Sequence, residues 1–206
     1  RKFGDRVTEE YPSNWEEAFL SSGLPYFDRA TMEMYRQGSI DTQPIRTGRF
    51  KMLAEKVAVW SEQPGGETRI YGNPEEGSRY SIGVDFASGR AKDYSAIAAI
   101  DVDRRQVVAT HKSKWQPDDV LDEAVLLGLT YKGPDGRPAL IVPERNGIGQ
   151  PLVDRLVHKI RYNNVYREHD TVAVKHHRGA RYGWATSNRS REWVLEELAR
   201  SVHQRT

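Results

Sequence analysis

Two acidic residues follow apolar runs at points where each run gives way to glycine and polar residues. Asp85 closes the run Tyr80–Asp85, and Glu144 comes two residues after the run Ala139–Val142. Apolar runs of this length predict buried strands. Carboxylates at the ends of two core strands present hard oxygen ligands to a divalent cation. The pattern therefore predicts a metal site for phosphoryl chemistry.

A third acid, Asp93, lies eight residues beyond Asp85, across a Gly-containing loop. We expect it to act as an additional ligand, with an Asx turn as the alternative. Asp85 by itself could equally be a turn or helix cap, and the pairing with Glu144 is what favours a metal site. Two ions roughly 3.5–4 Å apart could activate an attacking water and neutralise the leaving oxygen of a phosphodiester.

Other site chemistries fit the sequence less well. The chain has no Cys, and its histidines lack zinc-ligand spacing. No Walker A pattern is present. Gly83-Val84-Asp85 resembles the first phosphate loop of actin-like and sugar-kinase ATPases, but the sequence has no matching second Asp-Gly-rich loop.

Length and composition indicate a globular protein. The 206 residues, 37% hydrophobic and 29% charged, suffice for one domain or one domain with an appendage. No run reaches the roughly 18 apolar residues of a membrane span, and the start does not resemble a signal peptide. The absence of Cys excludes disulfides and fits a reducing compartment. The beginning at Arg1-Lys2 suggests a piece of a longer polypeptide.

Charge is unevenly distributed along the chain. Residues 155–206 hold 11 Lys and Arg against 5 Asp and Glu, whereas residues 1–154 hold 20 against 24. A basic C-terminal part beside an acidic centre suits a polyanionic ligand placed over a metal site. A solvated Arg-rich face is the alternative.

Residues 1–79 predict an irregular arm and linker. Asn14 and Asp28 are placed to cap short helices, and β-prone pieces follow at 56–60 and 68–71. From Tyr80 the pattern predicts a mixed α/β sheet with helices on its faces. The expected strands are 80–85, 95–101, 106–115, 139–142 and 171–175, and the expected helices are 117–131, 149–160 and one starting at Ser187 or Asn188.

Three motifs in order resemble the large terminase subunit of tailed bacteriophages. They are residues 10–23 (EYPSNWEEAFLSSG), Gly83-Val84-Asp85 with Gly89 and Asp93-Tyr94-Ser95, and residues 144–149 (ERNGIG). The resemblance implies that residues 1–79 are an arm and linker from the ATPase region. It implies that residues 80–206 are a ribonuclease-H-like nuclease domain, truncated at its C-terminal end. In that fold three antiparallel strands are followed by parallel additions, with helices on both faces.

The resemblance also implies site roles and a cofactor. Asp85 and Glu144 would be the first and second catalytic metal ligands, with Asp93 as the extra acid, holding two Mg²⁺ or Mn²⁺ ions. The family has a further acidic ligand late in the chain, which has no match before Thr206. Glu192, Glu196 and Glu197 are instead expected on the solvent face of the final helix.

The implied activity is endonucleolytic cleavage of double-stranded DNA during genome packaging. Its partners would be the portal protein, the small terminase subunit and the ATPase domain of the same polypeptide, with no membrane. Its place would be the cytoplasm of the infected host, at the procapsid. The alternatives are another ribonuclease-H-like nuclease of the resolvase or transposase type, and a noncatalytic docking module of the packaging motor.

Basic residues near the metal loop and in the C-terminal third are the expected DNA contacts. Gly-flanked Arg and Lys can follow a phosphate backbone without reading bases, although a solvated hairpin would look the same. The residues are Arg90, Lys92, Arg145, Lys175, His176, His177, Arg178, Arg181, Arg189 and Arg191.

Overall fold

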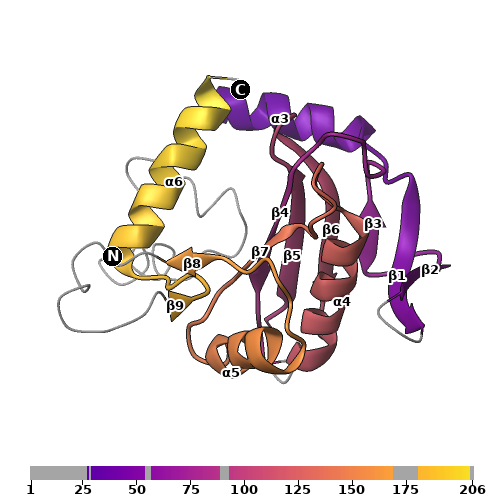
Figure 1. The fold of residues 1–206 in the computed structure, drawn as a ribbon. Helices are drawn as coiled ribbons and strands as arrows, with labels where there is room; N and C mark the ends of the chain where they lie inside the picture. The colour runs from indigo at the N-terminus through magenta and orange to yellow at the C-terminus, as the bar shows by residue number, and fades with distance from the viewer. Residues whose placement is uncertain (1–26, 28, 54–56, 89–92, 169–180, 205–206) are drawn as a thin grey trace. The chain divides into compact units, whose positions relative to one another are not determined.

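A computed structural model describes residues 27, 29–53, 57–88, 93–168 and 181–204 (Figure 1). The chain divides into two compact units, Thr42–Ser187 and a second one comprising Arg1–Asp41 and Asn188–Thr206. The helix expected after Asn14, the cap at Asp28 and the strand expected at 171–175 lie outside the described residues.

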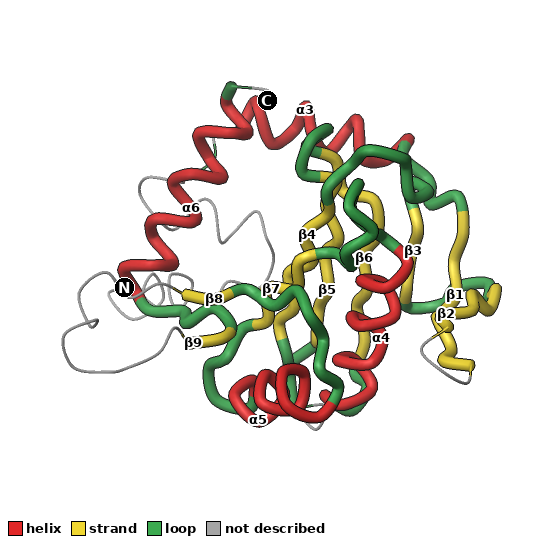
Figure 2. Tube along the Cα trace, viewed as in Figure 1, coloured by secondary structure: helices red, strands yellow, loops and turns green. Residues whose placement is uncertain are grey.

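The larger unit is built on a seven-stranded mixed sheet, drawn in yellow in Figure 2, with strand order β2-β1-β3-β6-β5-β4-β7. Strands β4, β5 and β6 form the expected antiparallel meander, and β7 pairs with β4 in parallel. The predicted mixed sheet is therefore confirmed. The strands are β1 (Arg46–Leu53), β2 (Val57–Glu62), β3 (Thr68–Ile70), β4 (Tyr80–Asp85), β5 (Ser95–Asp101), β6 (Gln106–Ser113) and β7 (Leu140–Pro143).

Side-chain alternation along β4 decides which face carries the core. Tyr80, Ile82 and Val84 are buried, whereas Gly83 and Asp85 between and beyond them are exposed. Successive side chains of a strand point to opposite faces. One face of the sheet is thus packed, and Asp85 belongs to the other.

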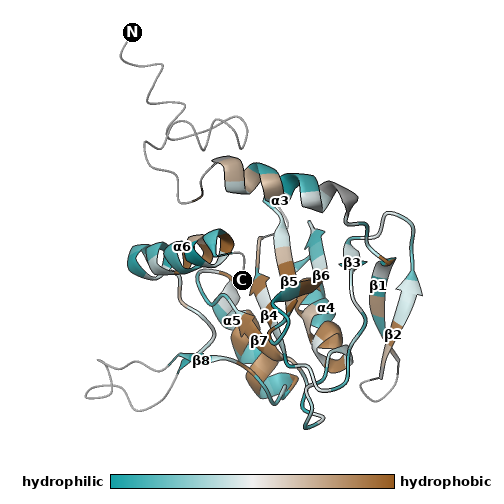
Figure 3. Cartoon of the chain, turned by 90° about the horizontal axis from the view of Figure 1, so that it is seen from above, coloured by the Kyte–Doolittle hydropathy of each residue, from teal (hydrophilic) through white to brown (hydrophobic). Residues whose placement is uncertain are grey.

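Helix α4 (Pro117–Thr130) covers the packed face. Pro117 occupies its first turn and Asp118 and Asp119 lie near its N-terminus, where the helix dipole favours negative charge. Hydrophobic stretches of α4 and α5 appear brown in Figure 3. The α4 side chains Val120, Leu121, Ala124, Val125, Leu126 and Leu127 are all buried.

Helix α5 (Gly149–Asp154) continues as a π-helical segment, η2 (Arg155–Lys159), and together they match the helix expected at 149–160. α4 contacts strands on both sides of β4 and also contacts α5. Within the described part of the larger unit, α4 and α5 are the α-helices. They lie on the packed face.

The sheet begins well before Tyr80, where the sequence placed the start of the nuclease domain. β1, β2 and β3 belong to the same sheet, and β1 is a strand that the sequence pattern did not predict. β3 is short, so the Phe50 amide of β1 has no strand partner there. Both carboxylate oxygens of Glu123 on α4 accept from this N–H, at 3.1 and 3.2 Å.

A buried polar chain joins β3, β6 and α4 beneath this corner. The Thr68 hydroxyl donates to Glu123 Oε1 at 2.6 Å and lies 2.9 Å from His111 Nδ1. His111 Nε2 lies 2.7 Å from the Ser113 hydroxyl. With Thr68 donating to Glu123, His111 carries its proton on Nδ1 and accepts at Nε2. Every member of the chain is then satisfied while the imidazole is neutral.

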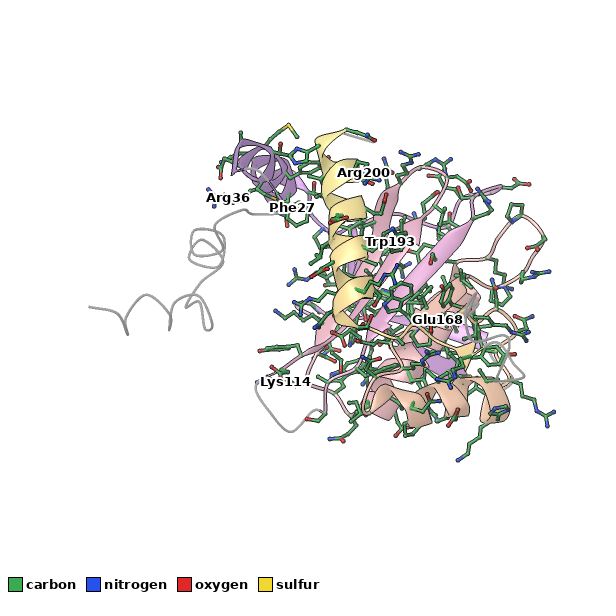
Figure 4. All side chains as sticks on the ribbon, turned by 90° about the vertical axis from the view of Figure 1, so that its left-hand side faces the viewer. Phe27, Arg36, Lys114, Glu168, Trp193 and Arg200 are labelled. Atoms are coloured by element: carbon green, nitrogen blue, oxygen red, sulfur yellow. The ribbon has the colours of Figure 1, made fainter. Side chains whose placement is uncertain are left out.

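The smaller unit contains α3 (Arg29–Asp41) and α6 (Asn188–His203), which confirm the helices expected in these regions. The Tyr35 hydroxyl of α3 lies 3.5 Å from the Val202 carbonyl oxygen of α6. Trp193 on α6 is 55% exposed (Figure 4). No helix among the described residues is both long and apolar enough to cross a membrane.

Replacing His111 tests the buried polar chain through pH. Burial lowers the pKa of His111 to about 4, so between that value and about 6.5 the unfolded chain binds a proton that the folded chain does not. His111 thus costs stability as pH falls through this window. Relative to His111→Gln, the wild type should lose roughly 3 kcal/mol of unfolding free energy between pH 7 and pH 4, measured by urea titration.

Burial raises the pKa of Glu123, and its contribution has the opposite sign. That contribution is complete at low pH and is lost as pH rises through the raised pKa. Because Glu123 is present in both proteins, it cancels to first order in the comparison. A stability difference that stays constant with pH would contradict the neutral, buried His111.

Gly128 of α4 tests how closely the helix approaches the loop after η2. A Cβ at this position would overlap the Tyr162 hydroxyl, which donates to the Ala139 carbonyl oxygen at 2.7 Å. Gly128→Ala should lower stability by about 1–2 kcal/mol, because overpacking outweighs the gain in helix propensity. Gly38→Ala in α3 is the control, since a Cβ there meets nothing within 4 Å. Equal melting temperatures for the two variants would refute the close approach.

Candidate metal centre

The parallel pairing of β4 with β7 brings the two acids singled out in the sequence to the same edge of the sheet. Val84 is paired with Pro143, so Asp85 and Glu144 are the next residues on each strand. The Glu144 amide donates to the Val84 carbonyl oxygen at 2.8 Å and extends the ladder by one step. Neighbouring strands lie about 4.8 Å apart, which sets the spacing of the two backbones at this point.

The side chains of the two acids interact. Partial desolvation raises the pKa of Asp85, and the neighbouring Glu144 carboxyl group raises it further. Two carboxylates in contact cannot both ionise without a cost in free energy. A divalent cation between them would remove that cost, and an all-carboxylate donor set fits Mg²⁺ or Mn²⁺.

Asp93 lies at the same edge but not in this pair. It comes two residues before β5, whose Ala96 is paired with Asp85. The Ser95 hydroxyl accepts from the Ala87 amide at 2.8 Å and ties together the two sides of the loop between β4 and β5. Across the described residues, no three His, Asp or Glu side chains are grouped so that they could hold a metal ion. The structure thus assembles two of the three predicted ligands.

The chain turns tightly after Glu144 before α5 begins. The Gly149 amide donates to the Asn146 carbonyl oxygen at 2.9 Å. A Cβ at Gly149 would overlap the Glu144 carbonyl group and would lie 3.7 Å from the Phe86 ring. The missing side chain therefore lets the start of α5 pack directly against the backbone of Glu144.

A distant segment pairs with this turn and holds its other side. The Trp184 amide donates to the Pro143 carbonyl oxygen at 2.8 Å, and the Arg145 amide donates to the Trp184 carbonyl oxygen at 2.9 Å. The Asn146 side-chain amide donates to the Thr186 carbonyl oxygen at 2.6 Å and accepts from the Thr186 amide at 3.1 Å. Glu144 is thus held between β4 and the segment 184–186.

The sequence pattern did not point to Asn146, Trp184 or Thr186 as residues that hold Glu144. Their interactions join positions about 40 residues apart, and no local periodicity encodes them. The Gly-containing turn at 144–149 was the available signal, and it indicated a tight turn without its partner.

Arg145 is part of an ion pair rather than a free cation. Its Nη2 donates to Glu168 Oε2 at 2.6 Å, and the Arg145 side chain is only 13% exposed. Glu168 belongs to β8 (Arg167–Glu168), which pairs with β9 (Arg181–Tyr182) in a two-stranded sheet. Glu168 thus takes up one arm of the guanidinium, and the role of Arg145 as a DNA contact stays a prediction.

The other predicted DNA contacts fall into three groups. Arg181 is exposed on β9. Arg189 and Arg191 are exposed on α6, in the other compact unit. The remaining predicted contacts lie outside the described residues: Arg90, Lys92, Lys175, His176, His177 and Arg178.

Removing the Asn146 side chain tests the link between the Glu144 turn and segment 184–186. Asn146→Ala loses two hydrogen bonds and should lower stability by about 1 kcal/mol, or roughly 2–4 °C in melting temperature. Asn163→Ala is a matched control, because Asn163 is also exposed and makes no side-chain hydrogen bond in the described structure. Indistinguishable melting curves for the two variants would show that the link contributes nothing.

The architecture can be compared with known proteins. No family model matches the sequence, and no curated protein does. Among solved structures, the cobalt-bound large terminase nuclease from thermophilic phage G20c is 15% identical over 77% of this chain and 65% of that chain, with a TM-score of 0.50.

Two further similar structures have lower TM-scores. The zinc-bound G20c nuclease is 15% identical over 80% of this chain and 74% of that chain, with a TM-score of 0.49. The large terminase nuclease domain of Thermus phage P74-26 is 16% identical over 68% and 60%, with a TM-score of 0.48. The likeness to the cobalt-bound enzyme shows that the chain has the ribonuclease-H-like fold of phage large terminase nuclease domains, as its motifs predict.

Proposed function

We propose that this chain is the metal-dependent endonuclease domain of a phage DNA-packaging terminase large subunit and hydrolyses phosphodiester bonds of double-stranded DNA. The observation that carries the proposal is the position of Asp85 and Glu144 side by side at the end of the parallel β4–β7 pair, where the Glu144 carboxyl group raises the pKa of Asp85. The fold and the order of the sequence motifs support it.

Asp85 and Glu144 would hold Mg²⁺ or Mn²⁺ in this proposal. The ions would supply Lewis-acid stabilisation of the charge that develops on the phosphate oxygens. Asp93, at the same edge of the sheet, is the additional acid. The G20c nuclease has been solved with bound zinc, magnesium and cobalt, and we propose that this chain also binds a divalent cation.

The residues around Asp85 and Glu144 would hold these two carboxylates in position and would take no part in the reaction itself. The turn at 144–149 and segment 184–186 fix the backbone of Glu144 from two sides. The Ser95 hydroxyl holds the loop that follows Asp85. A pair of carboxylates that repel each other and are held in place from several sides is preorganised for a cation.

Double-stranded DNA would lie across this edge of the sheet, held through its phosphates. Arg181, in the same compact unit, is a described candidate for such a contact. The proposed setting is the procapsid in the cytoplasm of an infected host. There the domain would act with the portal protein, the small terminase subunit and the ATPase domain of its own polypeptide.

Two other functions fit parts of the same observations. A resolvase- or transposase-type nuclease would share the acid pair but not the motif at residues 10–23. A noncatalytic docking module would share the fold but would not bind Mn²⁺. Metal titration separates the docking module from either nuclease.

Asp85→Ala tests the proposal with a structural and a functional measurement. Mn²⁺ should raise the melting temperature of the wild type, because a ligand that binds the folded state stabilises it. It should leave that of Asp85→Ala unchanged. Mn²⁺-dependent nicking of supercoiled plasmid should be lost in the variant, and its metal-free melting temperature should not fall, because the contact between two acids is relieved.

Glu76→Ala is the matched control, since Glu76 is exposed, acidic and forms no ion pair in the described structure. It should retain both the metal-induced stabilisation and the nicking. Full nicking by Asp85→Ala would overturn the proposed nuclease. A wild type whose melting temperature does not respond to Mn²⁺ at millimolar concentration would favour the docking module.

A further inference from the structure

Two lysines and a tyrosine form a cationic cluster at the same edge of the sheet as the acid pair. The Lys112 ammonium lies 4.6 Å from the centroid of the Tyr94 ring, and the Lys114 ammonium lies 4.9 Å from it. All three side chains are exposed, and Tyr94 is 47% exposed. Lys114, labelled in Figure 4, directly follows the end of β6. We call these three residues the Tyr94 cluster.

Strand register fixes where the Tyr94 cluster lies relative to Asp85. Asp85 is paired with Ala96, and Ala96 is paired with Lys112. Paired residues of neighbouring strands point to the same face, and two inter-strand steps amount to about 10 Å. The side chain between Asp85 and Lys112 is only a methyl group. No bulky side chain of β5 therefore lies between Asp85 on β4 and Lys112 on β6.

The positive charge of the Tyr94 cluster is not neutralised within the described chain. Neither Lys112 nor Lys114 forms an ion pair there. The nearby Glu67 carboxylate accepts from Trp115 Nε1 at 3.4 Å instead. Two ammonium groups within 5 Å of one ring repel each other, and the negative face of the aromatic ring offsets part of that repulsion. The two ammonium groups thus form no ion pair in the described structure, although Asp93 and the acid pair lie at the same edge of the sheet.

We propose that the Tyr94 cluster binds backbone phosphates of the DNA strand that is cut, with Lys112 and Lys114 as the contacts and Tyr94 as the residue that positions them. This inference rests on the proposed function. Two inter-strand steps place Lys112 about 10 Å from Asp85, so the phosphates that it contacts would lie close to the scissile phosphate. Ammonium groups contact phosphates without regard to sequence, as a nuclease that cuts many sequences requires.

The test is the salt dependence of duplex binding by the 206-residue chain. Binding of a fluorescent 30-base-pair duplex would be followed by anisotropy across a salt series, without divalent cations. Each phosphate contact contributes about 0.9 to the slope of log K against log salt. The double variant Lys112→Gln/Lys114→Gln should reduce that slope by about 1.8, whereas Lys132→Gln/Lys159→Gln, which removes two exposed lysines elsewhere, should not change it.

Variants of Tyr94 separate positioning from mere charge. Tyr94→Phe keeps the ring and should keep the slope and the affinity. Tyr94→Ala should keep both charges yet weaken binding several-fold at fixed salt, because the ammonium groups are no longer held together. Equal affinity of Tyr94→Ala and wild type would overturn the positioning role.

The outcomes are distinct from those that test the metal site. Lys112→Gln/Lys114→Gln should retain the stabilisation by Mn²⁺, and Asp85→Ala should retain the wild-type salt slope. An unchanged slope in the double lysine variant overturns the Tyr94 cluster as a DNA contact, whatever the fate of the nuclease. A reduced slope in the double lysine variant, together with an Asp85→Ala variant that still nicks plasmid, would support the Tyr94 cluster as a DNA contact and would contradict the proposed nuclease site.

Discussion

The parallel pairing of β4 with β7 is the constraint on which the rest of the site depends. Within the described seven-stranded sheet, the other five strand pairings are antiparallel. An antiparallel partner would place its following residues at the opposite edge. A parallel partner ends beside β4, so Asp85 and Glu144 leave the sheet together although they are 59 positions apart in the sequence. The crossover through α4 makes this possible, and α4 also buries the face that fixes the register of both strands.

Much of the fold could be predicted because its central elements carry strong local signals. Alternating buried and exposed residues predict the strands β4 and β5. The Pro-Asp-Asp sequence predicts the start of α4, and a short apolar run predicts β7. β1 could not be recognised in this way. Its sequence from Arg46 to Leu53 mixes basic and apolar residues around Gly48, and the hydrogen-bond partner of Phe50 is a helix side chain 73 positions away. Tertiary context supplies that partner, and no window of the sequence contains it.

In the candidate site too, residues with a local sequence signal could be predicted, and residues that depend on distant partners could not. Asp85 and Glu144 could be singled out from the sequence because each is an acid, each follows an apolar run, and each is followed by a glycine within a few residues. The ion pair of Arg145 could not be predicted, since its partner, Glu168, lies beyond the helix α5. Asn146 and Thr186 exchange hydrogen bonds that only the fold brings together. Only the strand register, which no local pattern encodes, sets Lys112 two strands from Asp85.

The attachment of β1 to the body of the sheet has a dynamic consequence. Beyond Gly48, β1 leaves β3 and is linked to α4 through the carboxylate of Glu123, while β2 forms the outer border of the sheet. A hairpin fastened by a side chain opens at lower free energy than strands paired along their whole length. We therefore expect the amide protons of this corner to exchange with solvent sooner than those of the strands that carry the acids.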